Sequence, residues 1–299
     1  MADFIIPIED PGASGPPPQP INDTFFNRTL TFFALRISGK GLLGRFWRQS
    51  ERLVVVWKYA IKVGASSLAE AHTMKFVAEN TSIPVPKVYC AFTHDKQVYI
   101  VMERIYGEDA ACHWTHRPEG SKARILVQLK GFIQQLRDIP PPPPSNDQYA
   151  VSNVIGGPIF DEHKQKLQPR GPFRTIDDFH NELRDGLELN KDNSALIPED
   201  LGELVKFHHQ PFSKVVFTHG DLSSVNIMVD DDDVVGIVDW ETAGWFPPYW
   251  EYVKAWNVDA QNAFWQDEVD KFLEPLLHER KMEVVRRKYF EPFSTRLLS

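Results

Sequence analysis

The chain has 299 residues, of which 42% are hydrophobic and 25% charged, a balance typical of a folded globular protein. Its formal net charge of −8 argues against a nucleic-acid partner, because neutralising nucleic-acid phosphates requires clustered Lys and Arg. No apolar run approaches the ~20 residues of a membrane helix and the N-terminus lacks signal-peptide character, so we expect a cytoplasmic protein with no membrane partner.

The first part of the chain predicts a lead-in, a helix and a strand. Residues 1–20 include a Pro- and Gly-rich stretch and predict a flexible N-terminal segment. Aromatic and aliphatic residues over 24–35 indicate a short packing helix. The Val-rich run LVVVWKYAIK over 53–62 predicts one strand. Because side chains alternate along a strand, Lys58 and Lys62 should share one of its faces.

A helix followed by two strands should come next. The helix is expected to begin near Ser67, because Ser67 and Glu70 fit the spacing of a capping box. Residues 83–86, IPVP, must be extended, since proline restricts its predecessor. Strands are predicted over 87–92 and 97–102. The order strand, helix, strand, strand predicts a small mixed-sheet lobe.

The rest of the chain is mainly helical in pattern. Apolar residues over 125–136 follow one face of an amphipathic helix, which must end before the prolines at 140–144. A helical pattern returns over 176–189 and again after Trp250. A larger helical lobe is therefore expected after a linker near residue 103.

Short strands are predicted over 214–218, 226–229 and 234–238. The four aspartates at 230–233 lie between the last two strands. They could bind a metal, but Asp is favoured in turns, so a solvated hairpin turn is the preferred interpretation.

The most informative stretch, FTHGDLSSVNIMVDDDDVVGIVDWETAGW, spans 217–245. Asn226 follows Asp221 by five residues, and Asp239 follows the next hairpin. Phosphoryl transfer needs an oriented hydroxyl and cations on the phosphates, with carboxylate and amide oxygens as suitable magnesium ligands. Protein kinases have the same Asp-to-Asn spacing in HRDLxxxN. The stretch therefore indicates phosphoryl-transfer chemistry.

The motifs HGDLSSVNIMV and GIVDWETAGW resemble the Brenner-type motif and metal motif of the aminoglycoside/choline phosphotransferase family. The segments ENTSIPVPKVY, YIVMERIYG and WFPPYWEYVKA are similar to its fungal-type subgroup. The resemblance covers roughly residues 50–256. It implies an α+β, bilobal, protein-kinase-like fold, with a small mixed-sheet N-lobe over 21–105 and a larger mainly helical C-lobe over 106–299.

The resemblance also implies roles for catalytic-loop and metal residues. Asp221 would orient or deprotonate the substrate hydroxyl. Asn226 and Asp239 would hold Mg²⁺. His219 would brace the catalytic loop by hydrogen bonding. Glu241 is interpreted as a structural hydrogen-bonding acid.

For the nucleotide, the resemblance implies that Lys62 reaches the ATP phosphates and that Glu70 pairs with Lys62. Lys58 remains the competing lysine, and Glu70 has a competing explanation as the capping-box acid. The hinge would run from Glu103 to Ile105 and offer backbone groups to adenine. Met102 would lie beside the base.

Two further features are less specific. The segment GKGLLG at 39–44 matches a GxGxxG pattern but lacks the strand–turn–helix context of a dinucleotide site, so a phosphate-covering loop is a minor alternative. Acids in the helical region could contact a cationic acceptor, although acids on helices usually face solvent. These are Asp259, Asp267, Glu268 and Asp270.

The sequence therefore predicts a Mg·ATP-dependent phosphotransferase that moves the γ-phosphate to a hydroxyl of an aminoglycoside-, choline- or sugar-like small molecule. A non-catalytic nucleotide-binding pseudokinase or regulatory protein is the alternative. A protein kinase is disfavoured, because the segment after Asp239 has no APE-like motif and is short for an activation loop. The sequence leaves the acceptor and the oligomeric state open.

Overall fold

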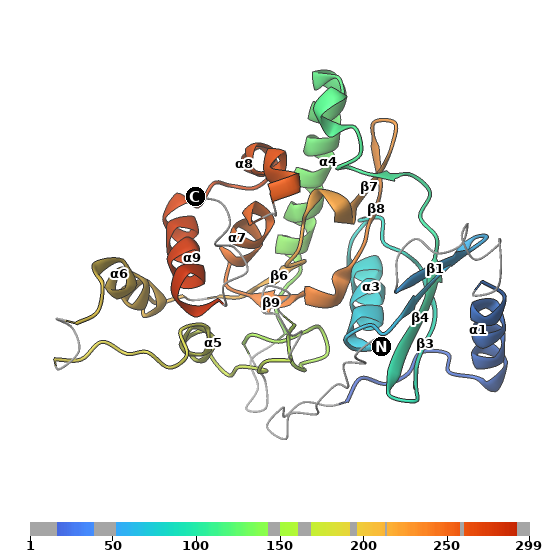
Figure 1. Ribbon diagram of the computed structural model, residues 1–299, viewed down its shortest axis with the longest axis horizontal. Helices are drawn as coiled ribbons and strands as arrows, with labels where there is room; N and C mark the ends of the chain where they lie inside the picture. Colours follow the sequence, from blue (N-terminus) through green and yellow to red (C-terminus); the bar gives the residue numbers. More distant parts are fainter. Residues whose placement is uncertain are drawn as a thin grey trace.

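The computed structural model describes residues 17–38, 52–142, 150–160, 169–191, 196–212, 214–257 and 260–291, with backbone only at 260 and 261. Figure 1 shows two groups of elements: a small antiparallel sheet with its helices, and a larger, mainly helical group. This α+β architecture confirms the predicted fold class.

The small sheet has the strand order β1-β2-β4-β3, with every neighbouring pair antiparallel, so the prediction of a mixed sheet is wrong in this detail. Helices α3 and α1 lie on opposite sides of this sheet (Figure 1). Side chains alternate accordingly: Phe92 and Tyr99 pack toward α1, whereas Ala91 and Ile100 belong to the core shared with α3. The elements of this part are α1 Phe25–Ser38, β1 Leu53–Val56, β2 Tyr59–Val63, α3 Ala69–Asn80, β3 Val88–His94 and β4 Gln97–Glu103.

The single strand predicted over 53–62 is wrong, because the run folds back as a hairpin. Val56 pairs with Tyr59, and the turn lies at Trp57 and Lys58. Trp57 adopts a left-handed φ of 54°, which is unusual for a bulky residue and is not signalled by Gly or Asn. Lys58 is therefore exposed in the turn, whereas Lys62 is buried in β2.

The capping box predicted at Ser67 is also wrong. Helix α3 begins at Ala69, and its N-cap position, Leu68, makes no side-chain cap. Ser67 Oγ instead accepts a hydrogen bond from the Ala69 N–H. Glu70 is thus free of the capping role and is turned into the interior, where it is only 3% exposed.

The helical group is built around α4, whose predicted apolar stripe is buried at Ile125, Leu129, Ile133 and Leu136. None of the helices in the described ranges combines the length and apolar character needed to cross a bilayer. The helices of this group are α4 Glu119–Asp138, α5 Ile176–Leu183, α6 Glu199–His208, α7 Trp250–Trp256, α8 Gln266–Phe272 and α9 Leu277–Phe290.

Helix α5 is shorter than the predicted 176–189, because the chain turns at Asp185 and Gly186, both with positive φ. Helix α6 was not predicted. Short 3₁₀ segments complete the helical elements: η1 Trp114–His116, η2 Ser224–Asn226, η3 Trp240–Thr242 and η4 Ala260–Trp265.

Two small sheets carry the chemically informative loops. One has the order β5-β7-β8 and the other pairs β6 with β9. The predicted acidic hairpin turn is confirmed between β7 and β8, where Asp232 pairs with Arg124 of α4. The strands are β5 Glu108–Asp109, β6 Val216–Thr218, β7 Ile227–Asp230, β8 Asp233–Ile237 and β9 Gly244–Phe246.

Candidate active site

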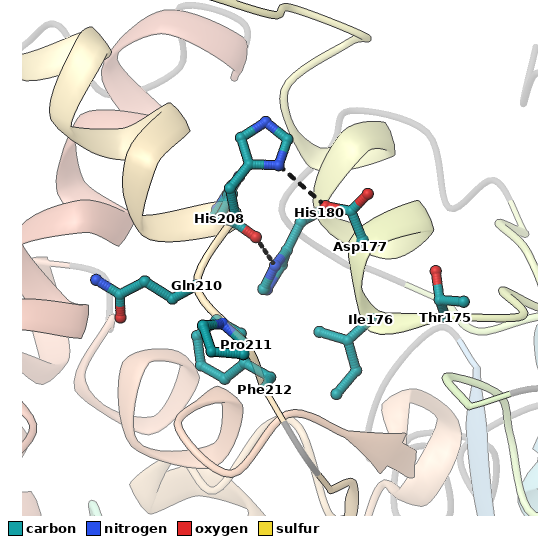
Figure 2. Close-up of a pocket in the computed structure, with 9 residues that line it drawn as sticks. Thr175, Ile176, Asp177, His180, His208, Gln210, Pro211 and Phe212 are labelled. Atoms are coloured by element: carbon teal, nitrogen blue, oxygen red, sulfur yellow. Dashed lines mark hydrogen bonds and ion pairs between the residues drawn. The ribbon is translucent and has the colours of Figure 1, made fainter.

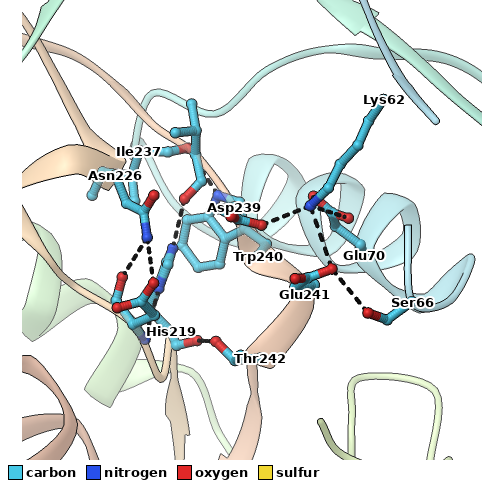
Figure 3. A network of polar contacts seen from close by, with 12 residues as sticks. Lys62, Ser66, Glu70, His219, Asn226, Ile237, Asp239, Trp240, Glu241 and Thr242 are labelled. Carbon is cyan, nitrogen blue, oxygen red and sulfur yellow. Dashed lines mark hydrogen bonds and ion pairs between the residues drawn. The ribbon is translucent and has the colours of Figure 1, made fainter. Parts of the chain in front are cut away.

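Lys62 lies at the centre of a cluster of three carboxylates (Figure 3). Its Nζ is 2.9 Å from Glu70 Oε2 and 2.7 Å from Asp239 Oδ1. Glu241 Oε2 lies 3.5 Å away. Strand β2, helix α3 and the segment after β8 therefore converge on one ammonium group.

The charges of this cluster are strongly coupled. Burial acts to lower the pKa of Lys62, but attraction to Glu70, Asp239 and Glu241 outweighs it, so the pKa is raised and the side chain stays protonated. Burial raises the pKa of Glu70 to about 7, with Lys62 opposing this shift and the other two acids adding to it. Three acids thus face one ammonium, which favours the approach of a further cation.

Glu241 has a more central position than the sequence indicated. Its side chain is 5% exposed, and it accepts a hydrogen bond from Ser66 Oγ at 3.1 Å. One oxygen from each of Glu70, Asp239 and Glu241 lies within 4.8 Å of the others. In the sequence, Glu241 could have been found from its position two residues after Asp239 in the DWE motif.

Asp221 and Asn226 form a directly bonded pair. Asn226 Nδ2 donates to Asp221 Oδ2 at 2.6 Å and to the Asp221 carbonyl at 3.0 Å. The five-residue spacing follows from the tight loop, in which η2 returns the chain toward Asp221. Because the amide nitrogen of Asn226 is bonded to Asp221, the amide oxygen points away from that carboxylate.

His219 braces this loop rather than facing the Asp221 carboxylate. Its Nδ1 accepts the Asp221 N–H at 3.2 Å, which fixes the tautomer. Its Nε2 therefore donates to the Val238 carbonyl at 3.0 Å. The ring packs on Trp240 with centroids 4.4 Å apart. Buried and hydrogen-bonded at both nitrogens, His219 holds the loop in place.

Val238 connects the two acidic loops through its backbone. Its N–H donates to the Asn226 carbonyl at 2.9 Å, and its carbonyl accepts from His219. Asp239 follows at once in a left-handed conformation, with φ 63° and ψ 61°. Asp239 thus follows directly on the residue that bonds Asn226, and its carboxylate contacts Lys62 (Figure 3).

Glu251 is a site residue that the sequence analysis missed. Its carboxylate accepts the His219 N–H at 2.7 Å and the Gly220 N–H at 3.0 Å, and it is fully buried at the start of α7. Gly220 has φ 84°, and a Cβ there would lie 2.8 Å from the Thr242 carbonyl oxygen. In the sequence, Glu251 is the acid of the segment WEYVKA, which was used only for the family resemblance.

The predicted hinge residues lie at the end of β4. Met102 is buried, with its Cα paired to that of Ala60 in β2, whereas Glu103 is exposed. Ile105 packs against Gly236 of β8, where a Cβ would lie 2.8 Å from Ile105 Cγ2. These residues join the two groups of elements, and their contact with adenine remains a prediction.

Some predicted features lie outside the described residues, namely residues 1–16 of the N-terminal segment, the 39–44 segment and Asp259. Two acids of α8 already have partners: Glu268 pairs with Lys271 at 2.8 Å, and Asp270 accepts from Tyr252 Oη at 2.8 Å. Asp267 is exposed on the same helix.

A separate cavity of about 380 Å³ lies between α5 and the end of α6 (Figure 2). His180, at its wall, donates from Nδ1 to the His208 carbonyl at 3.0 Å and accepts from Tyr249 Oη at 2.8 Å. Burial lowers the pKa of His180 to about 4 and that of His208 to about 2, so both rings are neutral. Because Tyr249 precedes α7, these rings support the helix that carries Glu251.

Comparisons with known proteins identify the family of this chain. Residues 44–287 match the model of the "Phosphotransferase enzyme family". An aminoglycoside 3'-phosphotransferase from Niallia circulans is 25% identical over 162 residues, which cover 54% of this chain and 53% of that protein. The chain thus matches about half the length of this curated relative.

Solved structures with the same fold are more distant in sequence. Aminoglycoside phosphotransferase APH(4)-Ia is 14% identical, with a TM-score of 0.51 over 88% of this chain and 83% of that chain. APH(3'')-Id from Streptomyces rimosus is 16% identical, with a TM-score of 0.50 over 88% and 98%. These likenesses support the fold, and the family match covers most of the sequence. The chain belongs to the phosphotransferase enzyme family.

Proposed function

We propose that this protein is a Mg·ATP-dependent phosphotransferase that acts on a hydroxyl of a small molecule. The observation that carries the proposal is the position of Asp239: its carboxylate bonds Lys62, and the preceding residue, Val238, bonds the backbone of Asn226, whose side chain holds Asp221. A cation-binding acid, a phosphate-binding lysine and a hydroxyl-facing acid are the parts that phosphoryl transfer requires.

Lys62 is the proposed ligand of the nucleotide phosphates. It is protonated and held by Glu70, whose side chain is only 2% exposed. Lys58 is a poor candidate, because it lies in the exposed β1–β2 turn with Nζ 5.3 Å from the Trp57 ring centroid. Two APH(4)-Ia structures with a TM-score of 0.50 hold ADP or AMP-PNP together with hygromycin B, which supports a nucleotide here.

The donor groups fit a magnesium ion, which prefers oxygen ligands. Asp239 is the open acid of the cluster, with 35% of its side chain exposed against 2% for Glu70 and 5% for Glu241. Asn226 would add its amide oxygen, because its nitrogen is engaged by Asp221. When bound, the ion would neutralise phosphate charge.

Asp221 is the proposed partner of the acceptor hydroxyl. Asn226 binds its Oδ2, and among the described residues Oδ1 has no hydrogen-bond partner. The carboxylate can therefore accept the proton of an incoming hydroxyl at Oδ1 while Asn226 fixes its orientation.

The arrangement after Asp239 favours a small acceptor over a protein. The chain passes from η3 to β9 and enters α7 at Trp250. Trp245, Phe246 and Tyr249 are buried along this path. The segment is thus part of the core and does not form a separate loop for a polypeptide substrate.

The test is ADP release by the purified protein with Mg·ATP and a panel of aminoglycosides, choline, sugars and amino-alcohols. We expect acceptor-dependent ADP release that Asp221→Asn lowers by about 10²–10⁴-fold. Asp231→Asn, in the exposed β7–β8 turn, is the matched control and should leave the rate unchanged. Nucleotide binding without turnover on any acceptor would contradict the proposal and indicate a pseudokinase.

A further inference from the structure

Helix α1 presents an unusually apolar outer surface. Of the twelve large hydrophobic side chains that are exposed within the described residues, five belong to this 14-residue helix. They are Phe25 at 87% exposed, Phe26 at 71%, Leu30 at 54%, Phe33 at 60% and Ile37 at 37%. Single exposed apolar residues are ordinary, but a contiguous group of this kind marks an interaction site.

The inner side of α1 is already anchored to the sheet. Phe32 packs edge-on against Phe92 and Tyr99, with ring centroids 5.9 and 5.3 Å apart. Just before the helix, Ile21 exchanges two backbone hydrogen bonds with Ala91 of β3, at 2.8 and 2.9 Å. The position of α1 therefore does not depend on its outer residues, which are left available for a partner.

The spacing of the outer residues suits a second helix. Phe26, Leu30, Phe33 and Ile37 are separated by four, three and four residues, the spacing of a seam between two packed helices. Arg36 is the only exposed charged residue of α1. A helix that lies on a membrane has many Lys and Arg on its polar face, whereas the centre of a protein interface is aromatic and poor in charge.

We propose that the outer face of α1 is a homodimer surface, on which the α1 helices of two copies pack antiparallel about a two-fold axis. In this register Phe26 meets Ile37 of the partner subunit, and Leu30 meets Phe33 of the partner subunit. Each of these contacts occurs twice, once from each copy, as a self-complementary two-fold interface requires, and each aromatic ring packs on an aliphatic side chain. In a parallel pair, each residue would instead face the same residue of the other copy, and the two helix dipoles would be aligned unfavourably.

The available area is sufficient for such a dimer. With aromatic side chains of about 150–250 Å² each, the five exposed residues offer on the order of 500 Å² per copy. Two copies would bury roughly 1,000 Å², the size at which a specific interface becomes plausible. Figure 1 places α1 at the outer edge of the molecule, on the side of the sheet away from α3. The surface is therefore separate from the Lys62 cluster, and the dimer and the proposed activity can be tested independently.

The first experiment measures mass in solution by light scattering and sedimentation over about 1–100 µM protein, which detects dissociation constants in the micromolar range or tighter. We expect the wild type to approach twice the chain mass of 34.4 kDa. Leu30→Glu and Phe33→Lys should each remain monomeric with an unchanged circular dichroism spectrum. Val127→Glu, at a 71% exposed residue of α4, is the matched control and should dimerise like the wild type.

Mixing the two monomeric variants tests the antiparallel register. In a mixed dimer, Glu at position 30 of one copy faces Lys at position 33 of the other, and the second Leu30–Phe33 contact stays intact. Dimer should therefore return in the mixture, whereas parallel pairing would leave it monomeric. The proposal would be overturned if the wild-type protein stays monomeric, or if the mixture of the two variants forms no dimer. A monomer that sediments with phosphatidylserine vesicles would also overturn it.

Discussion

Lys62 and Asp239 are 177 residues apart in the sequence, yet Lys62 Nζ lies 2.7 Å from Asp239 Oδ1. The contact joins the small sheet to the loop that follows β8. It also connects Glu70, which holds the lysine, to Val238, which holds the catalytic loop. The two halves of the proposed site are therefore assembled around one ion pair.

Removing the charge of Lys62 should destabilise the fold as well as abolish activity. In Lys62→Met the buried Glu70 and Glu241 lose their counter-ion, and breaking a buried pair in this way costs about 3–5 kcal/mol. We expect a lower free energy of unfolding by urea titration without nucleotide. Lys58→Met, in the exposed turn, should change it by less than about 0.5 kcal/mol. Equal effects of the two substitutions would contradict this assignment.

Glu251 should control the geometry of the catalytic loop without contacting substrate. A glutamine there can accept only one of the two backbone N–H groups well, so Glu251→Gln should cost about 1–3 kcal/mol of stability. Loop displacement should lower kcat by about 10²-fold, with a small change in the KM for ATP. Steady-state kinetics beside Glu274→Gln, an exposed control, would check this. A change confined to the KM would argue against a positioning role.

The buried histidines should make the protein sensitive to acid. The pKa of His180 is lowered to about 4 by burial, whereas an unfolded histidine has a pKa of 6.5. Between these values the unfolded state binds more protons, so the free energy of unfolding should fall as pH falls from about 6.5 toward 4. The full contribution of His180 is on the order of 3 kcal/mol.

His208 contributes to the same dependence, because its pKa is lowered to about 2. Its Nδ1 has no hydrogen-bond partner among the described residues, and its backbone carbonyl holds His180. His208→Leu should therefore preserve stability at pH 7 and flatten the loss between pH 6.5 and 4. Urea titrations at pH 7, 6 and 5 measure this difference. An unchanged slope in the variant would show that His208 does not titrate on unfolding.

The sequence was sufficient for elements in which pattern and chemistry agree. The stripe of α4 and the strands β3 and β4 follow from periodicity, and the β7–β8 turn follows from its aspartates. The sequence was not sufficient where an unusual backbone conformation determines where a strand ends. The turn at Trp57 sits inside a run of strand-forming residues, so no local signal divides β1 from β2.

In the candidate active site too, some contacts could be predicted from the sequence and others could not. The contact between Asp221 and Asn226 could be predicted from their spacing, because a short loop forces these two residues together. Glu241 and Glu251 were assigned no active-site role, since their partners lie far away in the sequence: Glu241 contacts Ser66 and Lys62, and Glu251 accepts two backbone N–H groups. Only the tertiary structure brings Glu251 to Gly220, 31 residues away.

The most direct test of the account is the magnesium dependence of ATP binding, measured by calorimetry on the wild type, Asp239→Asn and Asp221→Asn. Asparagine tolerates the left-handed backbone at position 239, so the substitution should alter the ligand set without breaking the fold. We predict that Mg²⁺ strengthens ATP binding to the wild type and to Asp221→Asn, but not to Asp239→Asn. Unchanged Mg²⁺-dependent binding by Asp239→Asn would contradict the account.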